Sequence, residues 1–206
     1  MDVKPHDLLR VTDITRLVTR PTEPEWVNEA LTLAPFVVVR RAPIENGKIP
    51  VGIRGKSRTQ RIAAFLERNA VDLHVAPEQF VSQKAWKKSP RYQRIKALRV
   101  LDFIEDVFLT YHLSWGPTGS VGFELASGVP TVTDKSDVDI VVRAPHFLSV
   151  ETAKQIVCEL SKSPVKIDPQ LETPKGAISL IEYSRGDPPM LLRTEEGPRL
   201  IGNPWS

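Results

Sequence analysis

Two aspartates separated by one residue, Asp137 and Asp139, have the spacing best suited to chemistry in this sequence. Residues 136–142 alternate as a half-buried strand does, so the two carboxylates share one face while the apolar residues face a core. Neighbouring carboxylates repel each other when both are ionised, and a divalent cation such as Mg²⁺ removes that repulsion. The spacing predicts a metal-binding pair, although two solvated acids on an exposed sheet face would give the same pattern.

A metal site for phosphoryl transfer usually needs a third carboxylate from a neighbouring strand. Residues 165–172 predict such a strand, in which Asp168 and Glu172 point to the same face. Pro169 has no N–H to donate, so the strand is expected to lie at a sheet edge or to break there. Asp168 is the preferred third carboxylate, with Glu172 and Glu182 as the alternatives.

The segment Trp115–Gly122 is rich in residues that allow tight turns, so its amides can approach a phosphate closely. Gly119 and the hydroxyl of Ser120 are the expected phosphate-binding groups, although an ordinary turn would have the same composition. A long interval separates Ser120 from the aspartate pair. We expect a loop containing Glu124 and Ser127 to fold back, so that Ser120 can meet the metal.

Residues 40–61 form a concentrated basic segment that could attract a polyphosphate. It contains a single acid, Glu45, against the basic residues Arg40, Arg41, Lys48, Arg54, Lys56, Arg58 and Arg61. Residues 58–66 predict a helix, whose amino terminus would be a ready anion site with guanidinium groups beside it. Arg54, Arg58 and Arg61 are therefore the candidate substrate-binding arginines.

Two other interpretations of the basic segment remain open. One is a solvated basic surface, and the other is a groove for nucleic acid. Aromatic residues do not interleave with these basic residues, although stacking on aromatics is usual where single strands are held. Nucleic acid is therefore not expected as a partner.

Composition narrows the class of protein. The chain has 206 residues, of which 41% are hydrophobic and 26% charged, enough for one good core or two small ones. No apolar run is long enough to span a membrane, and the first residues lack the apolar core of a signal peptide, so a cytoplasmic location without membrane contact is expected. The single cysteine excludes an internal disulfide, and the four scattered histidines argue against zinc.

The element pattern predicts an α+β protein in two parts. Residues 1–85 are expected to form a small α/β module that is basic and binds the donor, joined through residues 75–90 to a catalytic domain over residues 86–206. That domain should contain a mixed sheet. Its predicted elements are a helix at 93–109, a helix at 150–162 capped by Ser149, and a hairpin of strands 177–183 and 190–193 joined by residues 186–189.

These residues carry a resemblance. The order of features resembles the nucleotidyltransferase fold of the polymerase beta superfamily. In that fold a helix is followed by Gly-Ser, then by a strand with Asp-x-Asp, and then by a third acid on an adjacent strand. Over nearly its whole length the chain further resembles the phosphoribosyl-dephospho-coenzyme A transferases of malonate decarboxylase, also called holo-acyl-carrier-protein synthases. The segments that carry this second resemblance are 51–55, 58–61, 119–128, 136–139, 192–194, 197–200 and 204–205.

The resemblance implies a reaction and its partners. The prosthetic group of triphosphoribosyl-dephospho-coenzyme A would be transferred to a serine of the apo acyl carrier subunit of malonate decarboxylase, and pyrophosphate would leave. Asp137 and Asp139 would hold Mg²⁺, and Asp168 would be the third ligand or the group that accepts the serine proton. Gly119 and Ser120 would bind the triphosphate. The arginines at 54, 58 and 61 would hold either the triphosphate or the coenzyme diphosphate.

Two alternatives from other classes are kept. One is an adenylyl or uridylyl transferase that uses an ordinary nucleoside triphosphate, which would leave the amino-terminal arginines without their coenzyme-derived donor. The other is a non-catalytic nucleotide- or RNA-binding protein on a transferase fold. The presence of both Asp137 and Asp139 argues against this second alternative.

Overall fold

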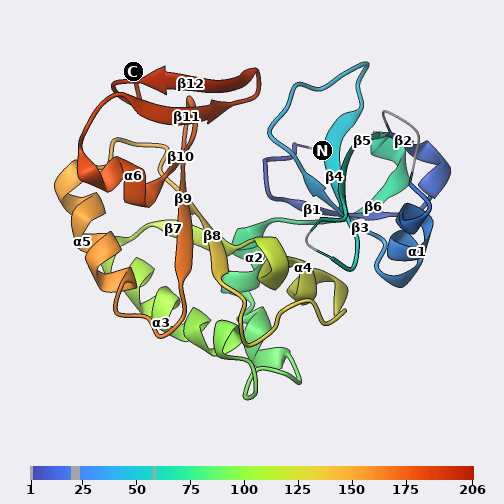
Figure 1. The fold of residues 1–206 in the computed structure, drawn as a ribbon, viewed down its shortest axis with the longest axis horizontal. Helices are drawn as coiled ribbons and strands as arrows, with labels where there is room; N and C mark the ends of the chain where they lie inside the picture. Colours follow the sequence, from blue (N-terminus) through green and yellow to red (C-terminus); the bar gives the residue numbers. More distant parts are fainter. Residues whose placement is uncertain (1, 20–23, 58) are drawn as a thin grey trace.

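The computed structural model describes residues 2–19, 24–57 and 59–206. In these residues the chain forms two six-stranded sheets with helices packed on them (Figure 1). Strands from the amino-terminal third, drawn in blue to green, form one sheet, and strands from the carboxy-terminal half, drawn in yellow-green to red, form the other. The predicted α+β class is confirmed, and the second sheet is mixed.

The first sheet is antiparallel at every strand pair described, in the order β2-β5-β4-β3-β1-β6. Helix α1 (Trp26–Leu33) packs Val27 and Leu31 against the apolar side chains of this sheet. The strands are β1 (Leu8–Val11), β2 (Leu17–Thr19), β3 (Phe36–Val39), β4 (Ile49–Arg54), β5 (Arg61–Leu66) and β6 (Val71–Val75), with short 3-10 turns at Ile14–Arg16 and Arg68–Ala70.

The helix predicted over residues 58–66 is wrong, because residues 61–66 form strand β5. Ile62, Ala64 and Leu66 alternate toward the core, which is the period of a strand. Antiparallel pairing with β4 over its whole length places Arg54 opposite Arg61. Residues 61–66 therefore do not provide the helix amino terminus that was expected to bind an anion. Arg58 lies outside the described residues.

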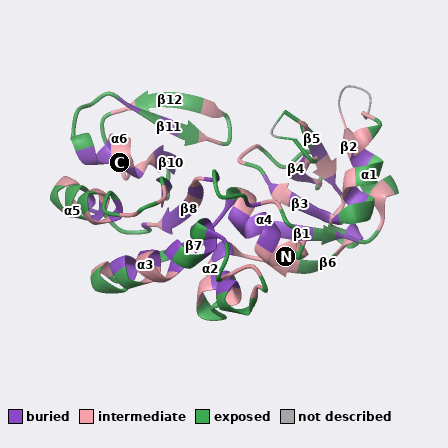
Figure 2. Cartoon of the chain, turned by 60° about the horizontal axis from the view of Figure 1, so that its bottom comes forward, coloured by how far each residue is buried: buried purple, intermediate pink, exposed green. Residues whose placement is uncertain are grey.

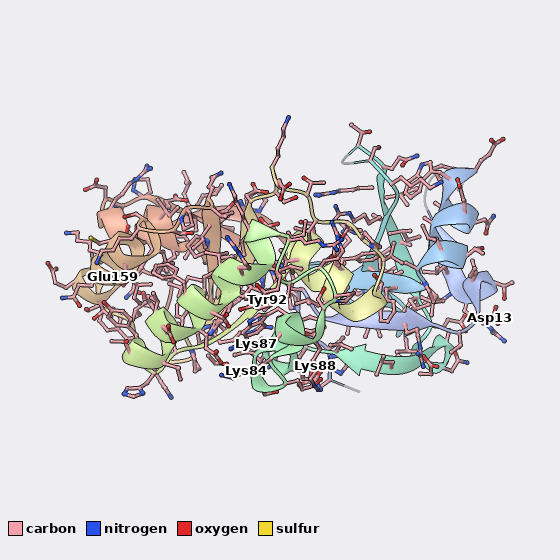
Figure 3. All side chains as sticks on the ribbon, turned by 90° about the horizontal axis from the view of Figure 1, so that it is seen from below. Asp13, Lys84, Lys87, Lys88, Tyr92 and Glu159 are labelled. Carbon is pink, nitrogen blue, oxygen red and sulfur yellow. The ribbon has the colours of Figure 1, made fainter. Side chains whose placement is uncertain are left out.

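The segment between the two sheets is folded and packed. It contains α2 (Pro77–Ser82) and a 3-10 turn, η3 (Ala85–Lys88), before α3 (Lys96–Tyr111). Trp86 is fully buried, and its indole N–H donates to the Asp102 carboxylate of α3 at 2.9 Å. Lys87 and Tyr92, which lie close together in Figure 3, bind the same carboxylate. Asp102 thus fixes η3 against α3.

The second sheet has the order β12-β11-β10-β9-β8-β7. Its strands β8 and β9 are parallel and are connected through α5, which Ser149 caps by accepting the Thr152 N–H at 3.0 Å. Helices α3 and α5 share one apolar core with the sheet. The elements are β7 (Ser114–Pro117), α4 (Gly119–Ser127), β8 (Val138–Arg143), α5 (Val150–Leu160), β9 (Ile167–Thr173), β10 (Gly176–Ser179), α6 (Leu180–Arg185), β11 (Met190–Thr194) and β12 (Gly197–Ile201).

The structure corrects two expectations in the second sheet. Strand β9 lies in the interior and is continuous through Pro169, so the expected edge or break is wrong. Pairing with β10 begins only at Gln170, so Pro169 has a strand neighbour on one side alone and its missing N–H is tolerated. Residues 180–183 are not a strand, since α6 begins after the Ser179 cap, although β10 and β11 pair as the predicted hairpin does.

Helix α4 lies between the two sheets, where Figure 2 shows it as largely buried. Phe123 of α4 joins Phe80 of α2 and Leu8 and Phe36 of the first sheet in one small apolar cluster. Residues 119–127 were expected to be a turn and part of a loop, and that expectation is wrong because this contact buries one side of a helix. The cluster holds α4 against both sheets.

Gly116 on β7 is predicted to be essential for the packing of α2. A β-carbon there would overlap the backbone carbonyl of Pro77 and lie 2.6 Å from its Cβ. We expect Gly116→Ala to lower the free energy of unfolding by about 2 kcal/mol or more, measured by urea denaturation. Gly202→Ala is the matched control, since nothing lies within 4 Å of an added β-carbon. Equal loss in the two variants would contradict the prediction.

Candidate active site

The parallel pairing of β8 with β9 brings two of the predicted carboxylates together. Asp139 is directly opposite Asp168 in the strand register, and Asp137 immediately precedes β8. Burial raises the pKa of Asp139, and the charges of Asp137 and Asp168 raise it further. Asp137 and Asp168 are therefore both close enough to act on Asp139, and negative charge accumulates where the two strands begin.

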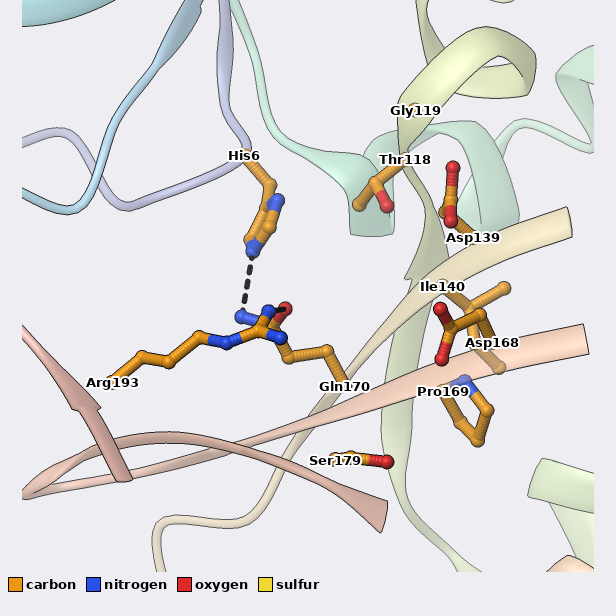
Figure 4. Close-up of a pocket in the computed structure, with 10 residues that line it drawn as sticks. All are labelled: His6, Thr118, Gly119, Asp139, Ile140, Asp168, Pro169, Gln170, Ser179 and Arg193. Atoms are coloured by element: carbon orange, nitrogen blue, oxygen red, sulfur yellow. Dashed lines mark hydrogen bonds between the residues drawn. The ribbon is translucent and has the colours of Figure 1, made fainter. Parts of the chain in front are cut away.

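The amino terminus of α4 is packed directly against this acid pair. The Thr118 N–H donates to the backbone oxygen of Asp139 at 2.9 Å. Gly119 follows with φ of +55°, and a β-carbon at that position would overlap the Asp139 carboxylate. Only glycine therefore allows the helix to begin so close to Asp139. Figure 4 shows Gly119 beside Asp139, with Asp168 on the neighbouring strand.

A small cavity of about 210 Å³ opens at this point, and we call it the acid cavity. It lies between the two sheets, and Figure 4 shows the side chains around it. Its lining residues are His6, Thr118, Gly119, Asp139, Ile140, Asp168, Pro169, Gln170, Ser179 and Arg193.

Ser120 is half-buried in the first turn of α4, but the loop expected to bring it to the metal does not form. Glu124 instead lies buried in the helix, where it binds Arg91 at 2.8 Å and accepts the N–H groups of Thr131 and Val132. Ser127 is also helical. Glu124 thus fixes the segment between α4 and β8, which leads to Asp137, so its role is to hold that segment.

The two alternative third carboxylates are engaged elsewhere. Glu182 lies on α6, where it accepts the Leu191 N–H at 2.8 Å. Glu172 is buried and forms an ion pair with Arg41 of the first sheet's β3–β4 connection. Burial alone would raise the pKa of Glu172, but its contact with His6 and the Arg41 charge lower that pKa to about 2. Asp168 is the acid that lies opposite Asp139.

His6 lines the acid cavity, although in the sequence it is only one of four scattered histidines. Its Nε2 lies 3.1 Å from the side-chain nitrogen of Gln170 and 3.6 Å from Glu172 (Figure 4). Arg193 donates to the same Gln170 from the other side at 3.3 Å. A pairing across more than 160 residues leaves no local pattern, so no spacing in the sequence points to His6.

The arginines at 54 and 61 line a second cavity that also touches Gly119 and Asp139. We call it the arginine cavity; its volume is about 400 Å³. The Arg61 charge lowers the pKa of Asp139, in opposition to burial and the neighbouring acids. The Arg54 guanidinium lies over the Phe123 ring, 5.9 Å from its centre. Two of the predicted substrate-binding arginines therefore lie beside the acids.

The donor atoms of the acid cluster suit Mg²⁺, which commonly takes one or two protein carboxylates and completes its shell with substrate phosphates. Among the residues that the structure describes, no three His, Cys, Asp or Glu side chains are already grouped to hold an ion. Asp137 and Asp139 would thus depend on the phosphates of a bound substrate for the remaining ligands. No helix in the described part of the chain is long and apolar enough to cross a membrane.

Comparison with known proteins decides the family. Residues 72–204 match the phosphoribosyl-dephospho-CoA transferase MdcG C-terminal domain, and residues 4–77 match the N-terminal domain of the same proteins. The chain belongs to the phosphoribosyl-dephospho-CoA transferase family. It is accordingly a transferase enzyme.

Relatives of this family cover almost the whole chain. The chain is 37% identical to a phosphoribosyl-dephospho-CoA transferase of Pseudomonas putida, with 98% of this chain and 95% of the relative aligned. It is 37% identical to that of Azotobacter vinelandii (98% and 94% covered) and 34% identical to that of Pseudomonas aeruginosa (98% and 93%). No solved structure gives a significant match.

Glu172 is predicted to make this transferase sensitive to acid. Its pKa is lower in the folded chain than the ordinary 4.5, so its stabilising effect is complete above 4.5 and is lost as the pH falls toward about 2. We expect roughly 3 kcal/mol of unfolding free energy to depend on this group. Urea unfolding at a series of pH values measures it.

Glu172→Gln should lower stability at neutral pH and flatten the dependence below 4.5. Glu151→Gln, on the exposed first turn of α5, is the matched control and should follow the unchanged protein. If the unfolding free energy falls below pH 4.5 in the same way in Glu172→Gln as in the unchanged protein, Glu172 is not the group responsible.

Proposed function

We propose that this enzyme transfers the phosphoribosyl-dephospho-coenzyme A group of triphosphoribosyl-dephospho-coenzyme A to a serine of the apo acyl carrier subunit of malonate decarboxylase. The supporting observation is the carboxylate pair Asp139–Asp168 against the α4 amino terminus, in a chain that matches both domains of this family. Pyrophosphate is the second product. The acceptor is a protein, so the attacking group must reach the acids from outside.

In the proposed reaction the serine hydroxyl oxygen attacks the phosphorus nearest the ribose. A bond forms between this oxygen and phosphorus, and the bond from phosphorus to the bridging oxygen of the diphosphate breaks. The electron pair leaves with the diphosphate, and the serine proton passes to a carboxylate. The product is a phosphodiester between the carrier serine and the ribosyl 5-phosphate.

Asp168 is our candidate for the proton acceptor. It is exposed, whereas its partner Asp139 is half-buried, so a residue presented by another protein can reach Asp168 more easily. It also lines the acid cavity together with Ser179 and Gln170. A carboxylate within hydrogen-bond reach of the attacking hydroxyl can draw its proton in the transition state.

Asp137 and Asp139 would hold Mg²⁺. The alternative role of Asp168 is that of a third metal ligand. The ion, when bound, supplies stabilisation for the charge that develops on the transferring phosphorus oxygens. The raised pKa of Asp139 supports this assignment, because mutual repulsion among the three acids is what a cation would relieve. Gly119 and Ser120, at the start of α4, would bind the donor phosphates through N–H groups and a hydroxyl.

Intact-mass analysis of the apo carrier subunit tests the reaction. The carrier is incubated with the enzyme, Mg²⁺ and triphosphoribosyl-dephospho-coenzyme A, and a gain equal to the phosphoribosyl-dephospho-coenzyme A group is expected. The double variant Asp137→Asn/Asp139→Asn should abolish the gain, because the metal ligands are lost. Asp134→Asn, an exposed acid in the same segment, is the matched control and should retain it.

If no mass is gained with a competent donor and carrier, the proposed donor or acceptor is wrong. Pyrophosphate release from ATP or UTP under the same conditions would then favour an ordinary nucleotidyltransferase. Nucleotide binding without release would favour a binding protein.

The titration of Asp139 gives a second test. In the metal-free enzyme we expect its carboxyl, followed by ¹³C NMR, to titrate above the ordinary value of 3.8. Asp168→Asn should lower this pKa, because one of the repelling charges is removed. Mg²⁺ should lower it as well, since the cation binds only the ionised form. An Asp139 titration that does not respond to Mg²⁺ would argue against the metal site.

A further inference from the structure

A third arginine, Arg40, reaches the arginine cavity in addition to the two predicted from sequence. The cavity is bounded by the first sheet on one side and by Gly119, Phe123 and Asp139 on the other. Arg40, Arg54 and Arg61 all line it, so arginines from three neighbouring strands or strand ends surround a cavity of about 400 Å³. Such a concentration of positive charge beside the acids calls for an anion.

Gly52 provides the path by which Arg40 reaches this cavity. Arg40 follows the end of β3, and Gly52 lies on the adjacent strand β4, paired with Val38. The Cγ and Cδ atoms of Arg40 lie 3.6 and 3.5 Å from the place where a Gly52 β-carbon would be. The aliphatic stem of Arg40 therefore lies across the surface that Gly52 leaves free, and a long side chain at position 52 would displace it.

The other two arginines face each other across the strand pair. Arg54 and Arg61 are directly opposite in the β4–β5 register, and like charges in that position destabilise a sheet. Both arginines line the cavity together with Asp139. A polyanion bound between the two strands would turn this repulsion into attraction.

We infer that the arginine cavity binds the leaving diphosphate of the donor. The inference rests on the proposed function, and it follows from the distribution of charge around the transferred phosphorus. The acid cavity contains Asp168, which attracts a proton and so suits the incoming hydroxyl. Three arginines line the arginine cavity, and Asp168 does not, whereas Arg193 is the one arginine that lines the acid cavity. The arginine cavity therefore better suits a group that gains negative charge as it leaves.

Gly119 and Asp139 line both cavities, so the transferred phosphorus is placed between them. In-line displacement requires the entering and leaving oxygens to lie on opposite faces of the phosphorus. With the serine entering beside Asp168, the diphosphate departs toward Arg40, Arg54 and Arg61. The bonds that form and break are those of the transfer described above, and the guanidinium groups remain fully protonated throughout.

Calorimetric titration with inorganic pyrophosphate in the presence of Mg²⁺ tests this inference. Arg40→Gln should weaken pyrophosphate binding about tenfold or more, because one charge-assisted contact is removed. Arg40→Lys should retain part of the affinity, since the charge remains but the two-pronged contact is lost. Arg10→Gln, on the first sheet and paired with Asp72, is the matched control and should bind like the unchanged enzyme.

Dephospho-coenzyme A is the second probe, because its own diphosphate is the competing occupant of the cavity. The inference expects Arg40→Gln to bind dephospho-coenzyme A within about twofold of the unchanged enzyme. A loss confined to dephospho-coenzyme A, or an equal loss for both probes, would overturn it. Unchanged pyrophosphate binding in Arg40→Gln would overturn it as well.

Substitutions at Gly52 give an independent measurement that leaves every arginine in place. A β-carbon would lie in ordinary contact with the Arg40 stem, so Gly52→Ala should bind pyrophosphate nearly as the unchanged enzyme does. Gly52→Leu should weaken it toward the Arg40→Gln value, provided that circular dichroism shows the same fold. Equal pyrophosphate affinity in the two folded variants would show that Arg40 does not reach the ligand through this path.

The pyrophosphate titration does not require transfer to a carrier. If Arg40→Gln loses pyrophosphate affinity and the unchanged enzyme adds no mass to the apo carrier, the diphosphate site is supported and the proposed donor or acceptor is rejected. If the unchanged enzyme adds mass to the carrier and Arg40→Gln keeps its pyrophosphate affinity, the proposed transfer is supported and the diphosphate site is rejected.

Discussion

The pairing of β8 with β9 is the constraint on which the site depends. These two strands are the parallel pair in the described part of the second sheet, and a parallel pair requires a crossover, which α5 provides. Their register places two acids side by side at one end of the pair. A shift of one residue would turn Asp168 to the opposite face, so the apolar packing that fixes the register also fixes the chemistry.

Charged residues join the two sheets near the same place. Arg143, at the end of β8, binds Glu78 of α2 at 2.5 Å and lies 4.0 Å from both Glu172 and the buried Asp7, which immediately precedes β1. Glu172 in turn binds Arg41 and contacts His6. The network is largely buried, so removal of one member would leave another charged group without compensation. Electrostatic contacts as well as the apolar cluster around Phe123 therefore hold the first sheet over the acids.

Sequence patterns predicted the parts of the site that depend on neighbours along the chain. The strand containing Asp139, the Ser149 cap and the strand containing Asp168 follow from alternation and capping over a few residues, whereas the parallel pairing of the two strands does not. Residues 58–66 were assigned to a helix because Ile62, Phe65 and Leu66 also have helical spacing. The pairing with β4 that makes residues 61–66 a strand is a tertiary contact. Contacts between His6 and Gln170, and between Arg40 and Gly52, arise from tertiary structure and leave no trace in local spacing.

The arginine cavity draws its cationic lining from the first sheet and its remaining lining from the second part of the chain. Neither part by itself contains all the residues that line the cavity. A ligand bound there contacts both parts, so its binding free energy is added to the contacts that hold them together. If the arginine cavity binds the donor, the family's two matched segments, 4–77 and 72–204, would each supply part of one binding surface. Exchange of either segment between relatives would then have to preserve the charge that faces the other.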